Sequence, residues 1–219
     1  MNELQRALSH TLFIGGTTDA GKTTFARAIA ARRGWRCYHG DKHELHQLIK
    51  RAQIQPELWP FLTEDVGQRS IATGQGILLA HQSLKGFRER FMYCVEDLFL
   101  LDHGQEVIAE GRNFTPELVA PVLQSEHQAI WLVPSDDFFR QSTESRNKRP
   151  AYIERDLVLR DHVKQQAAIH GLTVLEVDGS KDVTVMADLV EQHFKHYLDS
   201  NRVRWPFSRV AGGRLSEYD

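Results

Sequence analysis

The sequence predicts an α/β fold in which short apolar strands alternate with helices. Five apolar runs of strand length, at 12–14, 35–39, 106–110, 129–133 and 173–177, are separated by longer segments with helical patterns. A glycine-rich turn also joins the first of these runs directly to a helix-forming segment. The 219 residues, 41% of them hydrophobic, are enough for one α/β domain that carries an insertion.

The stretch 11–30 contains the strand, the turn and the helix of a phosphate-binding loop. Gly16, Gly21, Lys22 and Thr23 match the pattern G-x-x-x-x-G-K-[ST] at every defined position. Glycines let the backbone N–H groups turn inward around a phosphate, and the following helix points the positive end of its dipole there. The lysine adds charge near the β- and γ-phosphates, and the threonine is a ligand for Mg²⁺. A glycine turn before an ordinary helix is the alternative, but the strand before it and the helix after it favour nucleotide binding.

The expected cofactors are therefore ATP and Mg²⁺. The residues expected to bind them are those of the loop and the first helical turn: Gly16, Thr17, Thr18, Asp19, Ala20, Gly21, Lys22, Thr23 and Thr24. The helix is expected to end near Gly34, because glycine often terminates a helix.

The second strand, 35–39, ends in Gly40 and Asp41. Ligands of parallel α/β sheets bind beyond the carboxyl ends of the strands, so we expect Asp41 to face the phosphate loop. A carboxylate there can hold the hydroxyl of a phosphoryl acceptor and take its proton. Capping a helix is the alternative role for Asp41, and the two roles are compatible. His43 is a candidate acceptor contact; with His46 it would share a helix face, but two ligands are too few for a metal site.

The connection 45–105 is long for a link between two strands, and we expect it to be a helical insertion on the acceptor side. Thr63 and the acids that follow predict the start of a helix that runs to about residue 85, although glycines leave its ends uncertain. The segment 87–101 has a helical apolar stripe that predicts core packing: Phe87, Phe91, Cys94, Val95, Leu98 and Leu101. An insertion that covers the acceptor would set substrate choice.

The third strand, 106–110, ends in Glu110, with Gly111 and Arg112 directly behind it. An acid at this place, after a phosphate loop, is expected to support Mg²⁺ or the acceptor. Arg112 is expected to contact the acceptor or the phosphates. The alternative is a polar strand end that opens a loop. Thr115 with Pro116 then predicts the start of another helix.

A basic segment, 136–150, follows the fourth strand and contains Arg140, Arg146, Lys148 and Arg149. We expect a lid over the phosphates, with Arg146 and Arg149 stabilising the charge that spreads over the transferred group. A solvated surface is the alternative. A helix at 152–170, the fifth strand, a helix to about residue 198 and a polar tail at 201–219 complete the chain.

Composition limits the classes of function. The net charge of −2 makes a nucleic-acid partner unlikely, because such proteins are usually basic. The sequence has no run of 18 apolar residues for a membrane span and no signal-like apolar core near its start. Two cysteines, Cys37 and Cys94, do not suggest a disulfide framework. A cytoplasmic location is the simplest expectation, and the oligomeric state stays open.

With these residues in place, the chain resembles the P-loop small-molecule kinases, which include the nucleoside-monophosphate, shikimate and gluconate kinases. The resemblance runs from residue 11 to about 194. The phosphate loop is specific for the superfamily. The segment 39–41 resembles the acidic acceptor motif of shikimate- and gluconate-type enzymes, and 107–111 resembles the strand-three motif of the 2-phosphoglycerate kinase-like group. The segment 140–149 resembles the lid, and 178–183 falls where relatives contact adenine.

The resemblance implies a three-layer P-loop fold: a five-stranded parallel sheet of order 2-3-1-4-5, with helices on both faces and a lid. It also implies a single kinase domain at 1–200, with the insertion at about 45–105, the lid at about 136–150 and a tail at 201–219. The chain departs from relatives in lacking the glycine triplet of shikimate kinases and the acceptor-arginine pattern of adenylate kinases. The acceptor therefore stays open.

The leading hypothesis is an ATP-dependent kinase that transfers the γ-phosphoryl group to a hydroxyl or phosphate of a small molecule. Lys22 would stabilise the phosphates, Thr23 and Glu110 would support the metal, and Asp41 would be the base or the hydroxyl ligand. A GTPase-type switch is one alternative, although the sequence has no Asn-Lys-x-Asp guanine motif. A P-loop ATPase or ATP-binding scaffold without transfer is the other.

Overall fold

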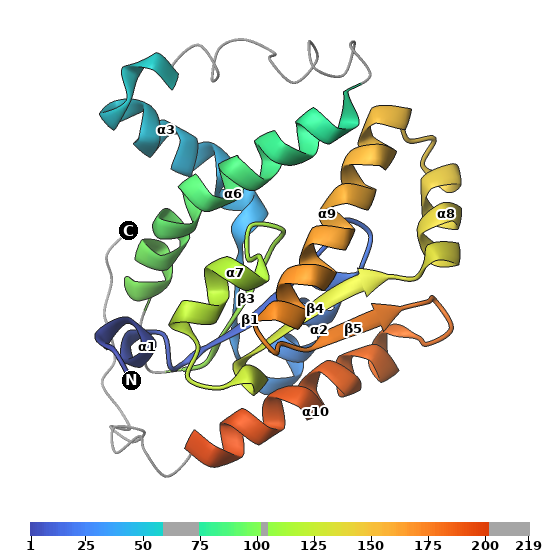
Figure 1. Ribbon diagram of the computed structural model, residues 1–219. Helices are drawn as coiled ribbons and strands as arrows, with labels where there is room; N and C mark the ends of the chain where they lie inside the picture. The colour runs from blue at the N-terminus through green and yellow to red at the C-terminus, as the bar shows by residue number, and fades with distance from the viewer. Residues whose placement is uncertain (59–74, 102–104, 202–219) are drawn as a thin grey trace, which may run out of the picture.

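A five-stranded parallel sheet forms the centre of the protein (Figure 1). The computed structural model describes residues 1–58, 75–101 and 105–201. Its strands are β1 (Thr11–Gly16), β2 (Arg36–His39), β3 (Val107–Glu110), β4 (Ala129–Pro134) and β5 (Val174–Val177). Their order is β2-β3-β1-β4-β5, and each neighbouring pair is parallel. The predicted fold class and strand order are confirmed.

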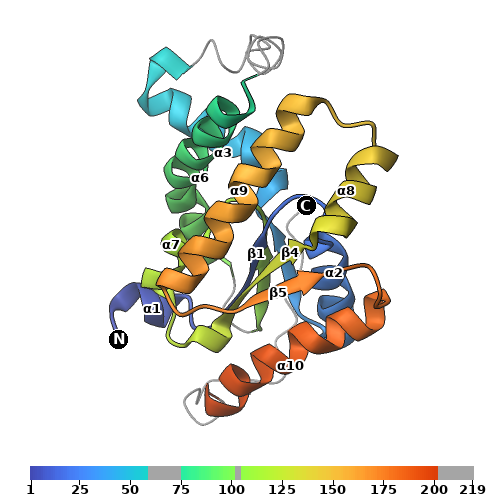
Figure 2. The ribbon, with the colours of Figure 1, turned by 45° about the vertical axis from the view of Figure 1, so that its right-hand side comes forward.

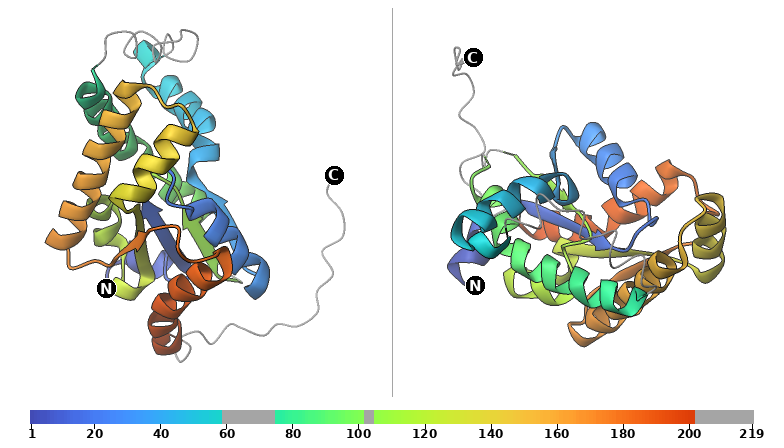
Figure 3. Two further views of the ribbon diagram at one scale, coloured as in Figure 1. Left: turned by 90° about the vertical axis from the view of Figure 1, so that its right-hand side faces the viewer. Right: turned by 90° about the horizontal axis from the view of Figure 1, so that it is seen from above.

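Helices cover both faces of this sheet (Figure 3). On one face α2 (Lys22–Arg33) and α10 (Val183–Asn201) bury a cluster that includes Ile14, Ile29 and Phe194. On the other face α6 (Gly76–Phe99), α7 (Pro116–Val119) and α9 (Pro150–Ile169) bury a second cluster around Phe13 and Trp131. Because both faces are covered, every residue of β1, β3 and β4 is buried.

The remaining elements connect these layers. The helices are α1 (Glu3–Ala7), α3 (Glu44–Ile54) and α8 (Asp136–Ser145), and the short 3₁₀ helices are η1 (Gly40–His43), η2 (Pro56–Leu58), η3 (Ala120–Val122) and η4 (Glu126–Gln128). Figure 2 shows α8 beyond the carboxyl end of β4 and α9 running back alongside the sheet. None of the described helices has a stretch that is long and apolar enough to cross a membrane.

Local sequence signals account for several helix ends. Gly34 ends α2 in the left-handed conformation, with φ of 68°, as the sequence predicts. Thr115 lies at the N-cap of α7 and Pro116 is its first residue, but the Thr115 hydroxyl makes no capping hydrogen bond. Ser135 caps α8 by accepting a hydrogen bond from the Phe138 N–H, so the basic lid segment begins as a capped helix.

The insertion differs from the sequence prediction in one respect. The patterns on either side of Gly86 belong to one continuous helix, α6, and not to two. Gly86 is tolerated inside α6 because the helix packs along its whole length, through Ala80, Phe87, Phe91, Cys94 and Leu98. The predicted helix start at Thr63 and the tail at 202–219 lie outside the described residues.

Candidate functional site

The phosphate loop has the backbone conformation that its sequence predicts. Gly16 and Gly21 have φ of 119° and 72°, and Asp19 adopts a left-handed φ of 64°. A Cβ on Gly16 would lie 2.0 Å from the Leu132 carbonyl oxygen, so only glycine fits there. No side chain caps the first turn of α2, so its N–H groups remain available at the loop. A helix N-terminus behind such a loop is suited to bind an anion such as a phosphate.

Lys22 is the buried cation of this loop. Its side chain is 7% exposed, and Nζ donates a hydrogen bond of 2.5 Å to the Thr17 carbonyl oxygen. Burial lowers the pKa of Lys22 to about 8, while the charges of Asp41 and Glu110 partly oppose this shift. The charged form of a lysine buried in this way is stabilised when a negatively charged phosphate binds beside it.

Thr23, Glu110 and His39 meet at the ends of three elements. The Thr23 hydroxyl donates to Glu110 Oε1 at 3.0 Å, and His39 Nδ1 lies 2.7 Å from the same oxygen. The two residues predicted to support Mg²⁺ therefore lie together, with hydroxyl and carboxylate oxygens of the kind that this ion prefers. Sequence analysis did not assign a role to His39. The signal was the sheet order, because His39 and Glu110 are directly paired between β2 and β3.

Asp41 and Arg112 form a pair beside the phosphate loop. The Arg112 Nε donates to Asp41 Oδ2 at 3.3 Å, and both side chains are about one third exposed. The other oxygen, Oδ1, is buried and has no hydrogen-bond partner among the described residues. Asp41 lies within η1 and does not cap a helix, which removes the alternative role. One oxygen of Asp41 is thus fixed by Arg112, and the other keeps an unused capacity to accept a hydrogen bond.

Two histidines, His43 and His46, lie near Asp41 in the sequence. The His43 ring stacks on the Tyr38 ring at 4.6 Å between centroids. His46 is exposed on α3. Within the part of the chain that the structure describes, no group of three or more potential ligands forms a metal cluster.

The basic segment reaches the phosphate loop through carboxylates. Arg146 and Lys148 each lie 2.5 Å from an oxygen of Asp19, which is only 2% exposed. Burial and these cations have opposite effects on the pKa of Asp19. Burial raises it, but the hydrogen bond and charge of Lys148 and the charge of Arg146 leave the pKa below its ordinary value. Arg149 is exposed before α9 and is not brought to the loop.

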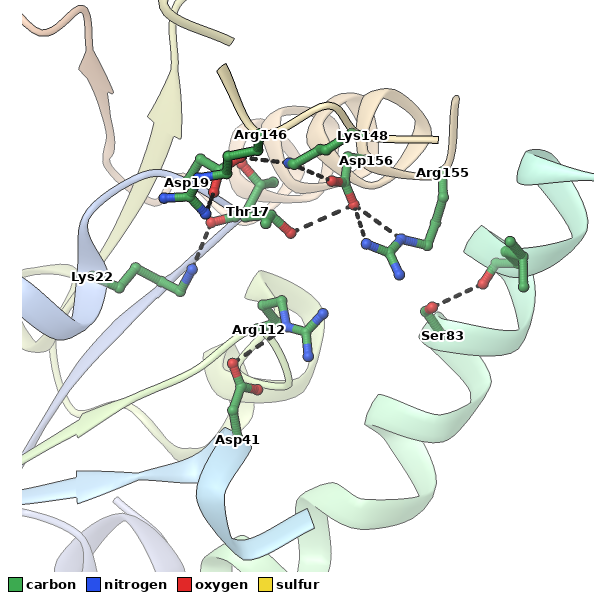
Figure 4. A network of polar contacts seen from close by, with 12 residues as sticks. Thr17, Asp19, Lys22, Asp41, Ser83, Arg112, Arg146, Lys148, Arg155 and Asp156 are labelled. Carbon is green, nitrogen blue, oxygen red and sulfur yellow. Dashed lines mark hydrogen bonds and ion pairs between the residues drawn. The ribbon is translucent and has the colours of Figure 1, made fainter. Parts of the chain in front are cut away.

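A second buried carboxylate, Asp156 on α9, completes this network (Figure 4). Lys148 Nζ lies 3.1 Å from Asp156 Oδ2, and Arg155 binds Asp156 Oδ1 at 2.6 Å. The Thr18 hydroxyl donates to the same Oδ1 at 3.4 Å. Sequence analysis gave Asp156 and Arg155 no role, because they lie within a long helix of mixed charge and no local pattern marks them.

A cavity lies between the phosphate loop, α6 and α9. Its polar side is formed by Gly16, Thr17, Thr18, Arg112, Thr115 and Asp156, and its apolar side by Leu84, Phe87, Leu159 and Val163. In Figure 4, Arg112 and Arg155 point toward this space from opposite sides. The cavity therefore combines one guanidinium, that of Arg112, and one carboxylate, that of Asp156, with an apolar wall.

A sequence comparison with curated proteins finds one relative that is similar over most of the chain. A 2-phosphoglycerate kinase from Thermococcus kodakarensis is 26% identical over 211 residues, covering 86% of this chain and 69% of the relative. No family model matches the chain.

Two solved structures are also similar. Shikimate kinase from Acinetobacter baumannii in complex with shikimate has a TM-score of 0.49 and 17% identity, covering 91% of this chain and 99% of that one. An uncharacterised protein from Eubacterium ventriosum has a TM-score of 0.42 and 11% identity, covering 84% and 98%.

The strand before the loop is the third in the order β2-β3-β1-β4-β5, and the loop leads directly into α2. This chain has a P-loop small-molecule kinase-like fold.

Proposed function

We propose that this protein is an ATP-dependent kinase that phosphorylates a hydroxyl of a small anionic acceptor. The observation that carries the proposal is the state of Asp41, whose Oδ2 is held by Arg112 while its buried Oδ1 lacks a partner among the described residues. An acceptor hydroxyl bound to Oδ1 would be placed beside the cation of the phosphate loop. Asp41 and Lys22 are close enough for the Asp41 charge to oppose in part the lowering of the Lys22 pKa by burial.

The chain's own residues divide the work. The N–H groups at the start of α2 and the Lys22 ammonium would hold the β- and γ-phosphates. Asp41 would orient the acceptor hydroxyl and accept its proton as the new P–O bond forms. Thr23 and Glu110 would hold Mg²⁺, which when bound neutralises developing charge on the phosphates. Arg146, 63% exposed at Asp19, would balance the charge of the transferred group.

Two guanidinium groups near the cavity suggest the class of acceptor. Arg112 and Arg155 reach toward this space from opposite sides, Arg112 paired with Asp41 and Arg155 with Asp156. A guanidinium binds a carboxylate or phosphate through two N–H groups at once. The similarity to a 2-phosphoglycerate kinase is consistent with an acceptor that carries a carboxylate together with a hydroxyl or a phosphate group. We therefore place 2-phosphoglycerate first among the acceptors to be tested, followed by other phosphorylated or carboxylated hydroxy compounds.

The test is ADP release from ATP and Mg²⁺ with a panel of acceptors. The panel spans phosphoglycerates, shikimate, gluconate and nucleosides, and Asp41→Asn is measured beside Asp137→Asn, an exposed carboxylate on α8. We expect an acceptor-dependent rate that Asp41→Asn lowers at least 100-fold and Asp137→Asn leaves unchanged. Arg155→Met should raise KM for the acceptor without changing KM for ATP. Hydrolysis that is independent of both acceptor and Asp41 would refute the proposal and favour an ATPase or a switch.

A further inference from the structure

The ends of β2 and β3 pack closely against one buried side chain, Asn113, whose Oδ1 has no hydrogen-bond partner among the described residues. A Cβ on Gly40 would lie 2.6 Å from Asn113 Oδ1, and a Cβ on Gly111 would lie 2.5 Å from the same atom. That second Cβ would also lie 3.5 Å from the Gly40 Cα, so the two glycines are neighbours. Neither has a positive φ, so glycine is required here by close approach to the Asn113 amide. Asp41 directly follows Gly40 in the chain, and Arg112 directly follows Gly111.

The amide nitrogen of Asn113 faces the opposite way, toward α6. Nδ2 donates to Cys94 Sγ at 2.8 Å, and Gln47 Nε2 on α3 donates to the same sulfur at 3.0 Å. All three side chains are fully buried. Burial raises the pKa of Cys94, so the sulfur is a neutral thiol that accepts two amide hydrogen bonds. Asn113 is therefore fixed between the glycine pair and the sulfur.

The helix that carries Cys94 also forms a wall of the cavity. Phe87 lines the cavity seven positions before Cys94, a separation of about 10 Å along the axis of α6. Ion pairs tie α3 to α6: Arg51 to Glu89 at 2.7 Å and Arg90 to Glu44 at 3.0 Å. A shift of α6 caused by a ligand at Phe87 would thus reach Asn113 through Cys94, because α6 is one continuous helix.

We propose that Asn113 is a positioning residue for the phosphoryl acceptor step. Its amide sets the separation of the two strand ends, and thereby aligns Asp41 with Arg112 and couples this pair to the acceptor wall on α6. The proposal rests on the kinase function proposed above. A positioning role differs from a packing role in what a substitution would change. Loss of packing alone would lower the stability of the protein without selectively slowing the phosphoryl transfer in which Asp41 takes part.

The experiment compares Asn113→Ala with Gln47→Ala. Both variants remove a buried amide that donates to the same sulfur, but of the two only Asn113 contacts the glycines. Gln47→Ala also removes a hydrogen bond of 3.1 Å to the Tyr38 hydroxyl. We expect both to lower the melting temperature by a similar amount. We expect kcat to fall at least tenfold only in Asn113→Ala, with KM for ATP within twofold of the wild type. An equal loss of kcat in both variants, or no loss in Asn113→Ala, would overturn the proposal.

A structural readout separates this proposal from the kinase assignment. Crystal structures of the two variants report the Asp41–Arg112 contact, which is 3.3 Å in the wild type, whether or not an acceptor has been identified. The contact is expected to open in Asn113→Ala and to persist in Gln47→Ala. If Asn113→Ala does not fold, Cys94→Ala, which leaves the Asn113 amide in place but removes its partner, is expected to open the same contact. A contact that stays closed in these variants refutes the positioning role even if the kinase activity is found.

Discussion

Replacing Lys22 with methionine tests whether the phosphate loop holds a buried charge before any ligand binds. Burial lowers the pKa of Lys22 from 10.5 to about 8. Each tenfold change in an ionisation constant corresponds to about 1.4 kcal/mol, so this shift is worth about 3 kcal/mol of folding free energy. Methionine has a similar length and no charge. We therefore expect Lys22→Met to be more stable than the wild type at pH 7, by about 2 kcal/mol once the lost hydrogen bond to Thr17 is subtracted.

The sign of the pH dependence follows from the two states of the lysine. The unfolded chain keeps the proton up to about pH 10.5, whereas the folded protein releases it near pH 8. Between these values the unfolded state binds more protons, so the free energy of unfolding of the wild type rises with pH. Below pH 8 the cost of the buried charge is present in full. The advantage of Lys22→Met should therefore shrink from pH 8 upward and disappear near pH 10.5.

The measurement is urea unfolding followed by circular dichroism at pH 7, 8, 9 and 10. Lys42→Met, which removes an exposed lysine of η1, is the matched control and should leave the free energy of unfolding unchanged. Taking the difference between each variant and the wild type cancels the groups that titrate in both. The reasoning is refuted if Lys22→Met is less stable than the wild type at pH 7, or if the difference does not change with pH.

The Asp156 network and the His39 contact give further expectations. Asp156→Asn should lower the free energy of unfolding by about 3 kcal/mol, because Lys148 loses a carboxylate that is 1% exposed. Asp137→Asn, at a carboxylate that is 92% exposed, should have no effect. Equal effects of the two variants in urea unfolding would count against the network. His39→Asn should weaken Mg²⁺-dependent ATP binding at least tenfold, because Glu110 loses the ring that orients it. ATP titrations with and without Mg²⁺ measure this, and an equal loss of affinity under the two conditions would contradict it. ATP binding by the wild type should take up protons at pH 8 and above, since the phosphates favour charged Lys22, and the uptake measured in calorimetry should be absent in Lys22→Met.

Much of the fold could be predicted because local patterns specify it. The apolar runs, Gly34 and the pair of Thr115 and Pro116 each act over a few residues, so strand and helix positions follow from the sequence. The strand order came from the resemblance that the phosphate loop supports. The continuity of α6 through Gly86 did not follow, because packing against α9 and the sheet outweighs the low helix propensity of one glycine.

The site was predictable where its residues follow strand ends. Asp41 and Glu110 come after β2 and β3, and the rule that ligands bind at these ends predicts their position without knowledge of the packing. Asp19 is expected to bind nucleotide as part of the loop, and its side chain pairs with Arg146 and Lys148, which the sequence did not predict. These contacts span more than 120 positions of sequence, and only the tertiary structure brings them together.

The glycines at the two strand ends show what the sheet order adds to the sequence. The sequence places each of them after a strand, Gly40 after β2 and Gly111 after β3, without relating one to the other. Once β2 and β3 are neighbours, the pairing of His39 with Glu110 makes Gly40 and Gly111 adjacent, and one amide, that of Asn113, accounts for both. A methyl group at either glycine would displace this amide, and with it the contact to Cys94. Gly111→Ala should therefore disturb the Asp41–Arg112 pair from the side opposite to Cys94→Ala, so the two variants probe one linkage at its two ends.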